Sequence, residues 1–336
     1  MKKKQYDQLN ILEKDNKLKT LESEKKDKDL LVLNKEKAYQ LVLSRSLKTG
    51  LAGSILVLVM LFLFFMRKRR DNRLMAEKNK QISAQKEQLE NSYNVIQSDL
   101  EQAKEYVLSL LPQKLNEGAL KTDWIFIPSS SLGGDAIGYM WIDNEHFAFY
   151  ILDVCGHWIG PALHSVSVMH FIRSGSQLNI DLRKPDIVVS SVNNAFQSED
   201  HNGMFFTMWY GVLNIKSGNL SYVCACHPAP LLKYENGDTI LLDPPSMTVG
   251  CVSGINYVAK NVQVHGRAEL FLFSDGTFEI IKPDKKSMLV DEFYNILKTT
   301  GTNGTELNHV HEHMAEIQGS KIFEDDFSIL KVKLAI

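Results

Sequence analysis

The chain has 336 residues, of which 44% are hydrophobic and 23% charged, so it is long enough for about two domains with a sizeable buried core. Its formal net charge of −2 gives no electrostatic basis for binding nucleic acid. The four cysteines lie in or beside apolar runs and match neither a disulfide framework nor a complete thiolate metal site, which predicts reduced thiols inside a cell. They are Cys155, Cys224, Cys226 and Cys251.

Residues 1–49 are rich in Lys and Glu and contain no Gly or Pro. Their leucines recur at roughly helical spacing, as at Leu9, Leu12, Leu18 and Leu21. This pattern predicts one long helix or a coiled-coil arm, and the alternative is a solvated helix without a partner.

Residues 50–66 are all apolar or small, and a helix of this length is near the minimum that crosses a bilayer. The segment starts too far from Met1, and lacks the small-residue cleavage site, for a secretory signal peptide. The basic cluster 67–70 (RKRR) predicts, by the positive-inside rule, that everything after the span is cytoplasmic. We therefore expect a single-pass protein of the inner membrane; the alternative is a buried core helix.

Residues 67–111 carry an apolar seam that alternates by four and three positions from Leu89 onward. The seam consists of Leu89, Tyr93, Ile96, Leu100, Ala103, Val107 and Leu110. This heptad pattern predicts a parallel coiled coil and hence a homodimer, whereas a single amphipathic helix is the alternative. The seam runs without interruption to Pro112, which should end the helix.

Residues 112–336 form the predicted globular domain. Strand-like runs are expected at 124–127, 147–154, 205–215, 220–226, 231–234, 240–242, 270–274 and 327–334. Turn signals at 214–219 and 235–238 join neighbouring strands as antiparallel hairpins. Helical patterns occupy 161–173, 185–197, 290–298 and 305–318. Many antiparallel strands with a few helices predict an α+β sandwich, not a doubly wound parallel sheet.

Carboxylates occur repeatedly where apolar runs begin or end. Asp153 ends the run 147–152, Asp275 follows the run 270–273, and Asp135 follows Gly133 and Gly134. A fourth acidic group, 324–326, enters the last apolar run. A buried carboxylate needs a charge partner, and no run of Arg or Lys adjoins these positions. Divalent cations are therefore the expected partners.

Six motifs together resemble the ordered motif set of the SpoIIE-type bacterial serine phosphatases, members of the metal-dependent PPM superfamily that includes protein phosphatase 2C. The motifs are 132–135 (LGGD), 153–157 (DVCGH), 204–211 (MFFTMWYG), 226–230 (CHPAP), 274–276 (SDG) and 325–328 (DDFS). The resemblance covers the chain from about Val107 to its C-terminus. It implies two antiparallel β-sheets sandwiched between helices, with two Mn²⁺ or Mg²⁺ ions at one edge of the sheets.

The resemblance also implies which residues form the site. Asp135, Asp153, Asp275 and Asp325 match the catalytic carboxylate ligands, and the backbone carbonyl of Val154 matches a further metal ligand. Asp326, beside Asp325, is an additional metal-binding candidate. Oxygen ligands select hard cations, and a water activated by two such ions can attack phosphorus without a covalent nucleophile.

The chain departs from the family pattern at three positions. Trp158 replaces a usual Gly, Cys226 replaces the Gly that commonly precedes His-Pro, and Gly138 stands where many members have an acidic residue. His157 and His227 are expected either to assist proton transfer or to hold their turns by hydrogen bonding. The alternating histidines His309, His311 and His313 are expected on a solvated helix, too widely spread to share a metal.

The sequence therefore predicts a membrane-tethered, metal-dependent protein serine/threonine phosphatase in bacterial signalling. By resemblance, its substrate would be a phosphoserine or phosphothreonine on a partner protein such as a STAS-type anti-anti-sigma factor. One alternative is a catalytically inactive PPM-fold interaction module. A second alternative is a structural membrane protein that acts through its coiled coil.

Overall fold

The computed structural model describes all residues except 1, 117, 130–131, 157–158, 244–245 and 301–305. The chain divides into two compact units, 1–92 and 93–336.

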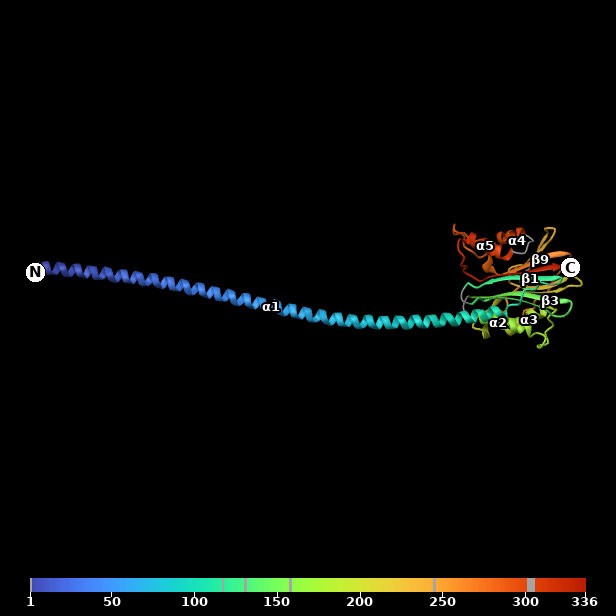
Figure 1. Ribbon diagram of the computed structural model, residues 1–336, viewed down its shortest axis with the longest axis horizontal. Helices are drawn as coiled ribbons and strands as arrows, with labels where there is room; N and C mark the ends of the chain where they lie inside the picture. Colours follow the sequence, from blue (N-terminus) through green and yellow to red (C-terminus); the bar gives the residue numbers. More distant parts are fainter. Residues whose placement is uncertain (1, 117, 130–131, 157–158, 244–245, 301–305) are drawn as a thin grey trace. The chain divides into compact units, whose positions relative to one another are not determined.

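The N-terminal part of the chain is a single helix, α1, Lys2–Leu110 (Figure 1). No Gly or Pro interrupts the helix apart from Gly50 and Gly53, and none of its residues is buried. In the described part of the chain, α1 is the one helix apolar and long enough to cross a membrane, a property that signal sequences and buried helices share. Of the predicted seam, Leu89, Tyr93 and Ile96 are exposed, at 70%, 60% and 57%, whereas Leu100, Ala103, Val107 and Leu110 are partly buried.

The second unit contains two five-stranded antiparallel sheets. The first sheet has the strand order β1-β10-β9-β6-β7, and the second has β2-β3-β4-β5-β8. The first comprises β1 Leu120–Ile127, β10 Phe327–Ala335, β9 Arg267–Phe273, β6 Leu231–Tyr234 and β7 Thr239–Leu241. The second comprises β2 Asp135–Trp141, β3 His146–Val154, β4 Phe206–Asn214, β5 Asn219–Ala225 and β8 Lys260–Gln263.

Helices cover the outer faces of both sheets. α2 (Ile159–Arg173) and α3 (Pro185–Ala195) pack on the second sheet, and α4 (Val290–Thr299) and α5 (Glu306–Gln318) pack on the first (Figure 1). Two short 3₁₀ turns are η1 (Ser198–Asp200) and η2 (Asp275–Thr277). The predicted α+β class, with two antiparallel sheets between helices, is confirmed.

The buried apolar side chains form two clusters, one larger than the other. The larger cluster lies between the sheets and under α2 and α3, and it includes the fully buried Tyr150, Trp209 and Tyr210. The smaller cluster lies between the first sheet and the helices α4 and α5. Full burial of such aromatic side chains stabilises the fold by about 2 to 3 kcal/mol each, which fixes the strand ends that carry the acidic residues.

Strands β2 and β8 are missing from the expected set of strands, and Gly138 at the centre of β2 explains the first omission. Glycine disfavours a strand, but Gly138 lies directly opposite Tyr150 of β3. A Cβ atom at position 138 would overlap the Tyr150 ring, so the ring fills the space left by the missing side chain. The ring therefore occupies the place where an acidic side chain would have to lie, which accounts for this departure from the family pattern.

Candidate active site

The acidic residues singled out in the sequence come from four segments. Asp135 begins β2 and lies directly opposite Asp153 of β3. In the other sheet, Asp275 lies two residues after the end of β9, and Asp325 lies two residues before the start of β10. Because β9 and β10 are antiparallel neighbours, the end of one lies beside the start of the other.

Contacts between the two sheets join these strand ends. The Gly134 N–H, just before β2, donates to Oδ2 of Asp326 at 2.6 Å. Asp326 also accepts hydrogen bonds from the Ser129 and Asp135 N–H groups, at 2.8 and 3.3 Å. Both carboxylate oxygens of this buried residue already serve as acceptors, which favours a positioning role for Asp326 over its predicted role as a metal ligand.

Burial and mutual repulsion shift the pKa values of three of these carboxylates. Asp135 is 2% exposed, and its burial, followed by repulsion from Asp153 and Asp326, holds its pKa well above the ordinary value. Burial, then the charges of Asp275 and Asp325, raises the pKa of Asp153 to about 8. Burial and the charge of Asp325 raise the pKa of Asp275 to about 6. Among the described residues, no cation offsets these shifts at Asp135, Asp153 or Asp275.

The donor chemistry of this acidic cluster (Asp135, Asp153, Asp275 and Asp325) fits a hard divalent cation. Asp135 Oδ2 is buried and has no hydrogen-bond partner among the described residues. All four side chains offer oxygen, the atom that Mg²⁺ and Mn²⁺ prefer. Within the described ranges, however, no three His, Cys, Asp or Glu side chains are arranged to hold one ion. The assignment of the four carboxylates and the Val154 carbonyl as ligands therefore stays a prediction.

Glycines allow the close approach of the acidic segments. A Cβ on Gly276 would overlap the Asp326 carbonyl oxygen and lie 3.0 Å from the Asp325 carbonyl carbon. A Cβ on Gly134 would lie 2.8 Å from the Val154 carbonyl oxygen. These are backbone atoms, which cannot rotate away as a side chain could.

We expect Gly276→Ala to destabilise the protein by about 1 to 3 kcal/mol and to remove most of any metal-dependent activity, because it pushes the Asp325 segment away from Asp275. Urea unfolding and metal-stimulated hydrolysis measure the two effects. The matched control is Gly160→Ala in α2, where the nearest atom to a new Cβ is the Met204 sulfur at 3.8 Å. Equal behaviour of the two variants would show that the close approach at Gly276 is unimportant.

The histidine of the His-Pro motif is a structural residue of the site. His227 is 4% exposed, and its Nδ1 lies 2.8 Å from the Thr207 hydroxyl. Thr207 is the neighbour of Asp153 across β3 and β4. Burial lowers the pKa of His227 to about 3, partly offset by the Phe273 backbone. The imidazole is therefore neutral near pH 7, which favours the hydrogen-bonding role over proton transfer.

The predictions for the other histidines and for Trp158 compare with the structure as follows. His157 and Trp158 lie outside the described residues. His309 and His313 are exposed on α5, as expected for a solvated helix. The expectation is wrong for His311, because its ring packs against Phe323 and Phe327 and is partly buried. The aromatic contact comes from the start of β10, which helical spacing alone could not reveal.

Cys226 has a left-handed backbone with φ of 57°. This region favours Gly, which is the residue that commonly precedes His-Pro in the family that the sequence resembles. A non-Gly residue there costs about 1 kcal/mol.

We therefore expect Cys226→Gly to raise the free energy of unfolding by about 0.5 to 1 kcal/mol, measured by urea denaturation. The control is Cys251→Gly, since Cys251 is also exposed but has no positive φ. That variant should lose stability because Gly gains more freedom in the unfolded chain. Destabilisation of similar size in both variants would mean that the backbone at Cys226 is unstrained.

The sequence comparisons identify a family and several relatives. The family model described as Stage II sporulation protein E (SpoIIE) matches residues 143–335. Phosphoserine phosphatase RsbP of Bacillus subtilis is 25% identical over 224 residues, covering 64% of this chain and 54% of RsbP. Phosphoserine phosphatase RsbU of the same organism is 22% identical over 247 residues, covering 71% of this chain and 70% of RsbU. The chain thus spans only about half the length of RsbP.

The structural comparisons show the same fold. The SiaA-PP2C domain of Pseudomonas aeruginosa has a TM-score of 0.62 at 16% identity, covering 73% of this chain and 98% of that domain. The PP2C phosphatase domain of SpoIIE from Bacillus subtilis, with a regulatory fragment, has a TM-score of 0.56 at 15% identity, covering 66% and 64%. RsbX in complex with magnesium has a TM-score of 0.51 at 14% identity, covering 66% and 99%.

Proposed function

Because the chain belongs to the SpoIIE family, we propose that it is a metal-dependent protein serine/threonine phosphatase acting on a phosphoserine or phosphothreonine of a partner protein. The observation that carries this proposal is the acidic cluster, in which burial and then repulsion between carboxylates of the two sheets raise the pKa values of Asp135, Asp153 and Asp275. Repulsion among these carboxylates, together with the burial of Asp135, costs stability that bound cations would offset.

In this proposal, Asp135, Asp153, Asp275, Asp325 and the Val154 carbonyl hold two Mn²⁺ or Mg²⁺ ions. When bound, the ions would supply an activated water and positive charge for the phosphoryl oxygens. RsbX, which shares the fold, has been solved in complex with magnesium, and this supports the choice of a hard cation.

The protein's own contribution is to hold the oxygen donors in place. Asp326 ties the loop before β2 to the start of β10, and thereby sets Asp135 against the first sheet. Neutral His227 orients the Thr207 hydroxyl next to Asp153. Gly134 lets the Asp135 segment approach the Val154 carbonyl. The site therefore works by preorganised electrostatics, without a covalent nucleophile.

We further propose that residues 50–66 span the inner membrane, with residues 1–49 outside and the catalytic domain in the cytoplasm. Residues 67–111 would form a parallel coiled coil that makes the protein a homodimer. The support is that α1 is continuous and that Leu89, Tyr93 and Ile96 of the seam are exposed, whereas exposed apolar stripes usually have a partner.

RsbP and RsbU are named phosphoserine phosphatases, and the substrate proposed here is likewise a phosphoprotein, such as a STAS-type anti-anti-sigma factor. Comparing phosphoproteomes of cells with the wild-type chain and with Asp153→Asn tests this directly. We expect a small set of phosphoserine or phosphothreonine sites to gain phosphate in the variant. Unchanged phosphorylation would favour the inactive interaction module instead.

A further inference from the structure

The outer face of the first sheet is apolar at one end of its strands and charged at the other. Near the acidic cluster it is apolar and packs under α4 and α5, through Phe271 and Phe273 of β9 and Phe327 and Ile329 of β10. Toward the other end of the same strands, the alternate positions carry charged side chains instead, beginning with Lys331 and Glu269. Period-two alternation places all these side chains on one face.

The strand register aligns four of these charged side chains in a row across the sheet. Lys121 of β1 lies opposite Lys333 of β10, Lys333 lies opposite Glu269 of β9, and Glu269 lies opposite Lys233 of β6. We call this set the lysine row. Side chains directly opposite have Cβ atoms about 5 Å apart, and like charges so placed are destabilising. Lys121 and Lys333 thus put two positive charges on neighbouring strands, and Lys333 is also paired with Glu269.

Glu269 alone does not neutralise the positive charges around it. Its Oε1 is 3.0 Å from Lys331, which is 2% exposed, and 3.5 Å from Lys333. One carboxylate thus serves two ammonium groups, one of them buried. Its other oxygen, Oε2, is buried without a hydrogen-bond partner among the described residues, so it can still accept a hydrogen bond.

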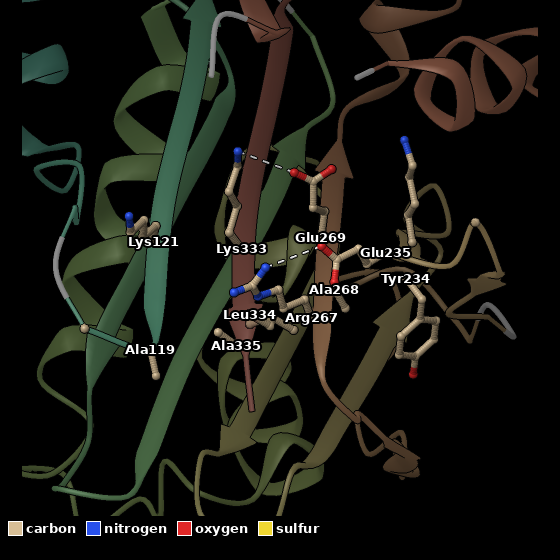
Figure 2. A pocket seen from close by; sticks show the side chains of 13 residues that line it. Ala119, Lys121, Tyr234, Glu235, Arg267, Ala268, Glu269, Lys333, Leu334 and Ala335 are labelled. Carbon is tan, nitrogen blue, oxygen red and sulfur yellow. Dashed lines mark hydrogen bonds and ion pairs between the residues drawn. The ribbon is translucent and has the colours of Figure 1, made fainter. Parts of the chain in front are cut away.

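The lysine row lines a cavity of about 430 Å³, within the usual size of small-molecule sites (Figure 2). Arg267 and Tyr234 also line it, as do the small residues Gly118 and Ala119. Figure 2 shows Arg267 joined to Glu235 and Lys333 joined to Glu269. The described lining has four cationic side chains (Lys121, Lys233, Arg267, Lys333) and two carboxylates (Glu235, Glu269).

The cationic side chains of this cavity differ in the hydrogen bonds and ion pairs that they already make. Lys233 donates to the Thr300 carbonyl at 2.7 Å. Arg267 pairs with Glu235 at 3.4 Å, but both side chains are well exposed, so this pair is weak. The ammonium of exposed Lys121 has no ion-pair or hydrogen-bond partner among the described residues. Lys121 and Arg267 are therefore available to an anion at little cost.

We propose that this cavity binds a small polyphosphate ligand, for which ATP is the probe. Phosphate oxygens would meet Lys121, Arg267 and Lys333. Tyr234 lines the cavity from the strand end, but its side chain points to the opposite face of the sheet, where its hydroxyl donates to the Gln263 carbonyl. The site is separate from the acidic cluster, because Glu269 lies four residues, about 13 Å, before the end of β9, and Asp275 lies beyond that end. This ligand is therefore not the phosphoester substrate.

The test is isothermal titration calorimetry of ATP into the full-length chain in detergent with EDTA, which keeps metal-bridged binding at the acidic cluster out of the measurement. We expect saturable binding that weakens with salt. Lys121→Gln/Arg267→Gln should raise the Kd about tenfold. The control Lys260→Gln changes an exposed lysine on β8 of the other sheet and should leave the Kd unchanged. Thermal unfolding of each variant establishes that it folds.

Two further probes separate the parts of the ligand. Inorganic pyrophosphate should compete with ATP, and adenosine should bind much more weakly than ATP. Three results would each overturn the proposal: no heat of binding at millimolar ATP, equal ATP affinity in the folded double variant and the wild type, or equal affinity for adenosine and ATP. Because hydrolysis is not measured, failure here leaves the phosphatase proposal untouched.

Discussion

Asp153→Asn is expected to abolish metal-stimulated phosphatase activity while making the metal-free protein more stable. The two effects have one cause. Asp153 lies among Asp135, Asp275 and Asp325, so its charge is repelled until a cation arrives. Asparagine keeps the size of the side chain but removes the charge, which relieves the repulsion and also removes the ligand. Asp275→Asn should behave in the same way, with a smaller gain in stability because the pKa of Asp275 is raised less.

The raised pKa of Asp153 predicts how the stability of the metal-free protein varies with pH. In chelator, the folded protein holds a proton on Asp153 up to about pH 8, whereas the unfolded chain loses it near 3.8. Between these values the folded state binds more protons, so the free energy of unfolding falls as pH rises. The total loss should be on the order of a few kcal/mol. Asp153→Asn should flatten this slope, and Mn²⁺ should oppose it in the wild type.

Urea unfolding with and without Mn²⁺, at several pH values, measures this effect. Asp291→Asn, an exposed carboxylate on α4, is the matched control and should change neither the slope nor the activity. If Asp153→Asn destabilises the metal-free protein at pH 8, the carboxylates do not repel one another as described. If it retains full activity, Asp153 is not a metal ligand.

Inserting one residue after Ser98 is expected to change the activity of the membrane-embedded protein about tenfold or more, and inserting seven residues should restore it. One residue turns the downstream helix by about 100°, whereas seven residues return the seam to its register. A tenfold change corresponds to a shift of about 1.4 kcal/mol in a two-state equilibrium. The direction of the change depends on which pairing of the helices is active.

Within the second unit, contacts connect the end of α1 through α2 to the strands that carry Asp135 and Asp153. α1 runs without a break to Leu110, whose carbonyl oxygen accepts a hydrogen bond from the Arg173 guanidinium at 2.6 Å. Leu108 and Leu110 also pack against the core. Arg173 ends α2, whose contacts with β2 and β3 place it over the strands of Asp135 and Asp153. Parental activity in both insertion variants would show that the helix is only a tether.

The sequence allowed most of the strands and helices to be predicted, because their apolar runs and turn residues are local signals. Strand β2 was missed since its glycine is compensated by Tyr150 on another strand. The anchoring role of Asp326 depends on N–H groups nearly two hundred residues away. The lysine row depends on the register of four strands, so neither feature has a local pattern in the sequence.

The central claim is tested most directly by the hydrolysis of p-nitrophenyl phosphate by the purified full-length chain in detergent, as Mn²⁺ is titrated in. We predict negligible hydrolysis in EDTA, saturable stimulation by Mn²⁺ or Mg²⁺, and no stimulation of the Asp153→Asn variant. Calorimetry on the same samples reports whether the metal binds. Hydrolysis that is equally fast in EDTA, or Mn²⁺ binding to a folded wild-type protein that still hydrolyses nothing, would contradict a metal-dependent phosphatase.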